Sequence, residues 1–178
     1  MEDQRSEITV REALRQLELL DHAQSERKRT CALDYYTPNA HQLRAHKSKA
    51  RFVILCGGNR IGKTTYGAVE LSHHLTRKYP DYIPFERRFN RPIRAVVVCL
   101  ENQIIERVIE PKVREFLPAS YVKQWKRVQA GYLNRITCVD SSTVDFLTSE
   151  QDDMAFEGAK WDFYWGDEPQ RRRKYEAI

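Results

Sequence analysis

The feature that most constrains the fold is a glycine-rich run at residues 57–64, with the sequence Gly-Gly-Asn-Arg-Ile-Gly-Lys-Thr. It follows a short apolar run at residues 52–56 and precedes a stretch in which apolar residues have helical spacing. Glycine lets the backbone turn tightly around an anion, and the N-terminus of a following helix directs N–H groups at that anion. The run therefore predicts a phosphate-binding loop, or P-loop, in an α/β fold. A chance match in a turn is disfavoured because both flanking elements are present.

The residues of the P-loop are predicted to bind a nucleoside triphosphate, and we expect ATP. The Lys63 ammonium is expected to reach the β- and γ-phosphates, and the Thr64 hydroxyl is expected to coordinate Mg²⁺. Arg60 is a candidate for stabilising charge that develops on the γ-phosphate, with a surface salt bridge as the alternative. The expected contacts to the nucleotide are Gly57, Gly58, Asn59, Arg60, Ile61, Gly62, Lys63, Thr64 and Thr65.

A second candidate element is the carboxylate pair Asp167 and Glu168, which follows an apolar run far downstream of the P-loop. A Walker B element has this form. Asp167 would hold Mg²⁺ through its water shell, and Glu168 would orient or deprotonate the attacking water. The alternative is a strand that runs into a solvated turn. Gly166 departs from the pattern, because a bulky residue is usual there and glycine weakens a strand.

A third candidate element lies upstream of the P-loop, where Tyr36 and Gln42 flank a turn at Pro38. The aromatic face of Tyr36 is suited to stack on a base, and the Gln42 amide is suited to hydrogen-bond an adenine edge. A turn followed by an amphipathic helix explains the same residues equally well. Both interpretations stay open at the level of the sequence.

The spacing of apolar residues divides the chain into an N-terminal part, residues 1–34, and a nucleotide-binding domain, residues 35–178. Thr9 and Glu12 have capping-box spacing at the start of an amphipathic helix, and a charged linker is expected at residues 25–29. The helix after the P-loop is expected to begin at Gly62 and run to about Tyr79, before Pro80.

Further elements are predicted downstream. Apolar and β-branched runs indicate strands, which we expect at residues 52–56, 93–100, 135–139, 143–147 and 161–166. The strands at 135–139 and 143–147 flank a short turn and are expected to form an antiparallel hairpin. Residues 103–117 are predicted to be helical with a break at Pro111. Strands that alternate with helices give a mainly parallel sheet flanked by helices.

Composition narrows the classes of partner. Thirty Lys and Arg against 25 Asp and Glu leave a net charge of +5, which favours polyanions such as nucleic acid, although a solvated basic surface has the same composition. No apolar run approaches the length of about 18 residues that a membrane span needs, so we expect no membrane partner and a cytosolic protein. The four cysteines lack metal-ligand spacing, and His73 and His74 have no ligand-spaced partner.

Together these residues resemble the N-terminal ATPase region of the large terminase subunit of tailed bacteriophages, over roughly residues 35–169. Each motif alone is weak evidence for the family, but their order and spacing together are fairly specific for it. The motifs are Tyr36-Thr37-Pro38 with Gln42, the P-loop, Asp140-Ser141-Ser142-Thr143 leading to Ser149-Glu150-Gln151, Phe156-Glu157-Gly158, and Asp167-Glu168-Pro169. The resemblance implies a P-loop NTPase fold of the ASCE type and a motor that couples ATP hydrolysis to translocation of double-stranded DNA into a procapsid. It further implies a ring of copies that works with the portal protein and a small terminase subunit in the cytoplasm of the bacterial host.

The chain departs from the family pattern at two places. The family often carries an arginine four residues before the lysine, where Asn59 stands here, and Arg60 comes one residue later. The family also continues past the Walker B element with a coupling motif and a nuclease domain, whereas this chain stops at Ile178. Since the coupling-motif strand lies between the Walker A and Walker B strands in such folds, we expect a truncated domain with an incomplete sheet and little turnover of its own. Two alternatives remain: another P-loop ATPase such as a helicase-like enzyme, and a non-catalytic remnant that binds nucleotide.

Overall fold

The computed structural model describes residues 2–58, 60–149 and 160–167. Five strands form one sheet in the order β2-β3-β4-β1-β5. They are β1 (Arg94–Cys99), β2 (Val122–Arg127), β3 (Leu133–Cys138), β4 (Thr143–Thr148) and β5 (Phe163–Gly166). β1 pairs in parallel with β4 on one side and β5 on the other, while β3 pairs antiparallel with β2 and β4. The described sheet is therefore mixed, and its parallel part consists of β4, β1 and β5.

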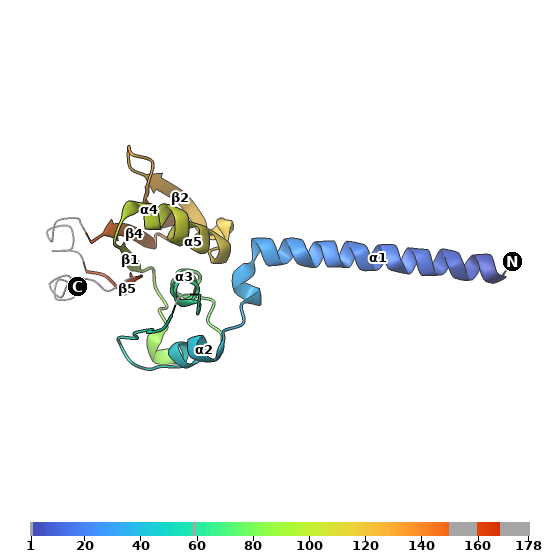
Figure 1. Ribbon diagram of the computed structural model, residues 1–178, viewed down its shortest axis with the longest axis horizontal. Coiled ribbons are helices and arrows are strands. Elements are labelled where there is room, and N and C mark those ends of the chain that lie inside the picture. The colour runs from blue at the N-terminus through green and yellow to red at the C-terminus, as the bar shows by residue number, and fades with distance from the viewer. Residues whose placement is uncertain (1, 59, 150–159, 168–178) are drawn as a thin grey trace.

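Helices flank this sheet, and the longest of them, α1, extends away from it (Figure 1). The longer ones are α1 (Glu2–Thr30), α2 (Ala40–His46), α3 (Lys63–Thr76) and α5 (Glu110–Phe116). α4 (Asn102–Ile104) continues through a π-helical turn (Ile105–Ile109) into α5. Short 3₁₀ turns lie at Ala32–Tyr35, Phe85–Arg87 and Ala119–Tyr121. None of the helices in the described ranges is both long and apolar enough to cross a membrane.

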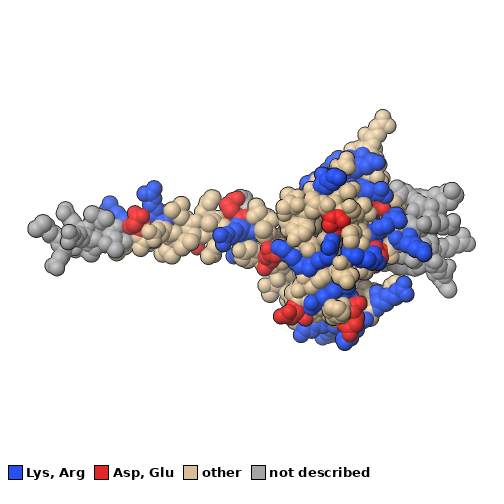
Figure 2. Space-filling view, turned by 180° about the vertical axis from the view of Figure 1, so that it is seen from behind, with Lys and Arg blue, Asp and Glu red and all other residues tan. Residues whose placement is uncertain are grey.

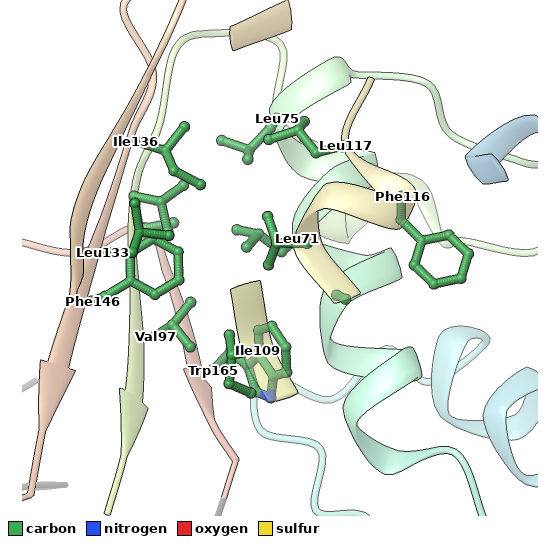
Figure 3. Packing of buried hydrophobic residues seen from close by; sticks show 14 of the residues in the cluster. Leu71, Leu75, Val97, Ile109, Phe116, Leu117, Leu133, Ile136, Phe146 and Trp165 are labelled. Carbon is green, nitrogen blue, oxygen red and sulfur yellow. The ribbon is translucent and has the colours of Figure 1, made fainter. Parts of the chain in front are cut away.

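The main core lies between one face of the sheet and the helices α3 and α5 (Figure 3). β1 is buried along all but its first residue, as expected for a central strand covered on both faces. Val97 faces the main core with Leu71 of α3, whereas Val96 faces the opposite side with Tyr164. The register aligns Val97 with Trp165 of β5, which brings Trp165 into the same core.

Most predicted elements are confirmed. The helix after the P-loop has Gly62 as its N-cap, and it ends at Thr76, a turn earlier than predicted, because Arg77 takes a left-handed conformation with φ 56°. β1, β5 and the hairpin β3–β4 occupy the predicted runs. The predicted break at Pro111 is wrong: the chain stays helical, and the π-helical turn just before the proline accommodates its missing N–H.

Three other predictions are wrong. Residues 52–56 do not form a strand, because no described strand pairs with them; the side chains of Phe52 and Ile54 are 76% and 84% exposed. The charged linker at 25–29 belongs to α1, since Glu, Arg and Lys are good helix formers. α1 also begins at Glu2, well before the capping-box position Thr9. Its apolar residues, including Val10 and Leu17, are exposed where it extends away from the sheet (Figure 1).

Candidate functional site

The shape of the P-loop is set by two residues with positive φ. Gly62 has φ 86° and Arg60 has φ 65°, so the chain reverses sharply just before α3 begins. A Cβ on Gly62 would lie 2.6 Å from the Gln42 amide nitrogen, and a Cβ on Gly57 would lie closer than 3.0 Å to the side chain of Ile61. Gly62 is therefore required by its backbone conformation and lies close to Gln42, whereas the tip of the Ile61 side chain could move aside for a larger residue at position 57.

The N-terminus of α3 has the properties of an anion site. Its N-cap, Gly62, offers no side-chain hydrogen bond to the first N–H groups of the helix. Such groups and the helix dipole attract phosphate. The Lys63 ammonium adds a positive charge, and it donates to the carbonyl oxygens of Gly57 at 2.8 Å and Gly58 at 2.9 Å. The Lys63 side chain thus bridges from the start of α3 to the first two residues of the P-loop.

The P-loop and the predicted acidic element meet in the structure. The Thr64 hydroxyl donates to the Asp167 carboxylate at 3.1 Å, although 103 positions separate them in the chain. Burial raises the pKa of Asp167, while hydrogen bonds from Thr64 and Trp165 and the charge of Lys63 act in the opposite direction. The protein therefore does not fully stabilise the charged form of this carboxylate, and a bound cation would stabilise it further.

The donor set of this site fits Mg²⁺. A hydroxyl and a carboxylate are hard oxygen ligands, and a nucleotide-bound Mg²⁺ takes only one or two protein carboxylates, with phosphate and water completing the octahedron. Among the described residues no group of three or more His, Cys, Asp or Glu could hold a metal by itself. Any Mg²⁺ at Thr64 and Asp167 would therefore need further ligands from a nucleotide and water.

Two side chains at the start of α2 hydrogen-bond to the backbone of the P-loop. Asn39 and Gln42 form a capping box at the start of α2. The Asn39 side chain donates to the Ile61 carbonyl at 3.2 Å, and the Gln42 side chain donates to the Gly62 carbonyl at 2.9 Å. Two successive carbonyls of the loop are thereby satisfied. The Asn-x-x-Gln spacing was the available signal, but sequence reasoning assigned Gln42 to the base and did not single out Asn39.

The positions of the remaining candidates differ. Gln42 is buried and its oxygen accepts from the Asn39 N–H, so one N–H and one lone pair remain for the predicted adenine contact. The Tyr36 hydroxyl is 3.1 Å from His46 Nε2 and its ring packs edge-on against His46 and Phe116, so its described ring contacts are to these residues rather than to the P-loop.

Arg60 is exposed, with no ion pair within the described part of the chain. Thr65 lies on the first turn of α3. Asn59 and Glu168 lie outside the described residues.

A buried carboxylate cluster joins α2 to α3, and no local sequence pattern indicates it. It consists of Glu70 with His46, His74 and Arg87. Glu70 Oε1 is 2.7 Å from His46 Nδ1, and Glu70 Oε2 is 3.1 Å from Arg87 and 3.3 Å from His74. Burial alone would raise the pKa of Glu70, but hydrogen bonds from the two histidines and the charge of Arg87 hold it far below its usual range. The cluster thus anchors α2, and with it Asn39 and Gln42, on the P-loop helix.

His73 on the same helix predicts a pH dependence of stability. Burial lowers its pKa from 6.5 to about 4, against a hydrogen bond from its ring to the Lys78 carbonyl. Between these pH values the unfolded chain binds a proton that the folded chain does not, so the free energy of unfolding falls as pH falls. The fall should reach about 3 kcal/mol by pH 4. His73→Asn keeps an N–H for Lys78 and should be less acid-sensitive in urea unfolding at pH 7 and pH 5. Identical pH dependence in the two proteins would exclude His73 as the cause.

Comparisons with known proteins bear on this geometry. A family model described as "Terminase large subunit, T4likevirus-type, N-terminal" matches residues 54–175, more than half of the chain. A search of curated proteins gives no match. A solved structure of the large terminase ATPase domain of Thermus phage P74-26, in mutant form, has a TM-score of 0.52 at 20% identity. The match covers 76% of this chain and 55% of that one, so the chain spans about half of its structural neighbour. The two share a fold.

Proposed function

Because the chain belongs to the family of the N-terminal region of T4-like terminase large subunits, we propose that it is the ATPase part of a motor that packages double-stranded DNA into a procapsid. The observation that carries the proposal is the hydrogen bond between Thr64 and Asp167. It places the hydroxyl that follows the P-loop lysine against the first carboxylate of the acidic pair. A helix N-terminus, a lysine, a hydroxyl and a carboxylate then surround one point, as phosphoryl transfer from a Mg²⁺-bound nucleotide requires.

This proposal assigns a role to each side chain of the site. Lys63 leaves the Gly57 and Gly58 carbonyls and pairs with the β- and γ-phosphates, while the N–H groups of α3 hold the other phosphate oxygens. Thr64 and Asp167 hold Mg²⁺, which supplies charge neutralisation on the phosphates. Glu168 orients and deprotonates the attacking water, and Arg60, on the exposed rim, stabilises charge on the γ-phosphate. Asn39 and Gln42 keep the loop carbonyls in place, and Gln42 also contacts the base.

The partners in this proposal follow from the family. Double-stranded DNA is the translocated substrate, the portal protein is the docking site, and a small terminase subunit and further copies of the chain complete a ring. The net charge of +5 suits a polyanionic substrate. Figure 2 shows Lys and Arg side chains spread over the visible face of the domain.

The proposed role of Glu168 in ATP hydrolysis is tested with the variant Glu168→Gln. If Glu168 is the general base, the variant should bind ATP as the wild type does, while the rate of phosphate release falls by about 100-fold or more. Release of phosphate from radiolabelled ATP measures the rate, and filter binding measures the affinity. Normal turnover by the variant would remove Glu168 from the mechanism.

The motor part is tested by adding DNA to the same assay. A double-stranded-DNA motor should hydrolyse ATP faster with duplex than with single-stranded DNA of the same length. Stimulation by single strands alone, together with duplex unwinding, would favour a helicase-like enzyme instead. Tight ATP binding with no hydrolysis under any of these conditions would favour a non-catalytic nucleotide-binding protein.

A further inference from the structure

We propose that Gly67 of α3 and Trp165 of β5 form a positioning pair that sets the distance between the P-loop and the magnesium-binding carboxylate of Asp167. The inference rests on the proposed function of the site and deepens it. Neither residue touches the nucleotide in this scheme. Their role is to place Thr64 and Asp167 at the separation at which both hold one ion.

The first step of the argument is a close approach. A Cβ on Gly67 would have three atoms of the Trp165 indole within 2.7 Å, so α3 lies on the ring at a distance that only glycine permits. Trp165 is 7% exposed and belongs to the main core, on the helix side of the sheet (Figure 3). Glycine inside a helix is otherwise unfavourable, since alanine is the better helix former. The close contact with the indole explains why α3 has a glycine at this position although glycine destabilises a helix.

The second step is alignment with the site. Gly67 follows Thr64 by three positions on α3, so both lie on one face of the helix. Trp165 precedes Asp167 by two positions, and Asp167 comes directly after the end of β5 at Gly166. Both contact α3, Trp165 at Gly67 and Asp167 at Thr64, so the two pairs are neighbouring contacts between this helix and the end of this strand. A shift at the first pair is transmitted directly to the second.

The third step is a direct link between Trp165 and the carboxylate. The Trp165 side chain also acts on the Asp167 carboxylate, whose pKa it lowers as the Thr64 hydroxyl does. Gly166 between them has no side chain, and β5 pairs with β1 alone among the described strands. The end of this short strand is held by the pairing of Gly166 with Val98, by the backbone hydrogen bond of Asp167 to Val98, by the Thr64 hydroxyl and by the indole packed against α3. Trp165 therefore both spaces α3 and orients the carboxylate.

The experiment measures ATP affinity with and without Mg²⁺ by calorimetry in the full chain. Gly67→Ala should push α3 off the indole and reduce the Mg²⁺-dependent gain in ATP affinity by about tenfold, as loss of an outer-shell support does. Affinity in EDTA should change little, because the P-loop itself is intact. The double variant Gly67→Ala/Trp165→Leu makes room for the added methyl group and should recover part of the spacing, with a melting temperature above that of Gly67→Ala. Trp165→Phe keeps a ring without the N–H and should also lose part of the Mg²⁺-dependent gain.

The matched control is Trp125→Phe on β2, at the opposite edge of the sheet, where Arg114 lies 3.8 Å over the ring. It should leave the Mg²⁺ dependence unchanged. Unaltered Mg²⁺-dependent binding in both Gly67→Ala and Trp165→Phe would overturn the positioning pair while leaving the proposed function intact. A double variant with neither the melting temperature nor the Mg²⁺ dependence improved over Gly67→Ala would overturn it as well. A wild-type chain that binds no ATP would overturn the proposed function and the pair together.

Discussion

Lys63→Ala is expected to abolish measurable ATP binding. The Lys63 ammonium is the cation that the P-loop holds, on the carbonyls of Gly57 and Gly58, beside the start of α3. A charge-assisted hydrogen bond contributes about 1.5–3 kcal/mol, and the lysine is proposed to make two such bonds with the β- and γ-phosphates, so the loss should be about 100-fold or more. Filter binding with labelled ATP measures it.

The control for this variant is Lys49→Ala. Lys49 is an exposed lysine paired with Glu86, and its replacement changes the net charge by the same amount. It should leave ATP affinity within about twofold, because exposed ion pairs contribute little. Comparable losses in the two variants would show that general charge, and not the P-loop lysine, governs binding.

Glu70→Gln is expected to have the largest effect on stability. Glu70 is the carboxylate that His46 and Arg87 contact in the buried cluster; in the variant the Arg87 guanidinium would lose its counter-charge and His46 would lose a charged partner inside the protein. Breaking a buried ion pair on one side costs about 3–5 kcal/mol of the free energy of unfolding, which urea denaturation at pH 7 measures. ATP affinity should fall too, because α2 with Asn39 and Gln42 is anchored through this cluster.

Glu86→Gln is the matched control, since Glu86 is exposed and paired only with Lys49 among the described residues. Its effect on the free energy of unfolding should be small, because an exposed ion pair contributes little. Equal unfolding free energies for the two variants would mean that the cluster contributes no more than a surface pair does. Reduced stability with unchanged ATP affinity would separate the cluster from the P-loop.

The sequence was sufficient wherever a local pattern decides the structure. The glycines and Lys63 predicted the P-loop, and the apolar runs predicted β1 and β5. β2, with the sequence Val-Lys-Gln-Trp-Lys-Arg, was missed because it is an edge strand with mostly exposed, polar side chains. The run at 52–56 has the composition of a buried strand, but hydrophobicity predicts burial and says nothing about which strand supplies the pairing.

The contacts that complete the site depend on distant parts of the chain. That Thr64 meets Asp167 was predictable from the order of motifs, and the structure confirms that they lie together. Two contacts depend on how the helices pack in the folded chain: Gly67 lies close to Trp165, and Glu70 anchors α2. No local sequence pattern encodes this packing. Residue spacing could show that Gly67 and Thr64 share a helix face, but not what lies opposite that face.

The most direct test of the central claim is the Mg²⁺ dependence of ATP binding by the wild-type chain. If Thr64, Asp167 and the P-loop form one site, calorimetry should show a single saturable ATP site whose affinity rises when Mg²⁺ replaces EDTA. The same titration should show no site in Lys63→Ala. Binding that is equally tight in EDTA, or that persists in Lys63→Ala, would contradict the account.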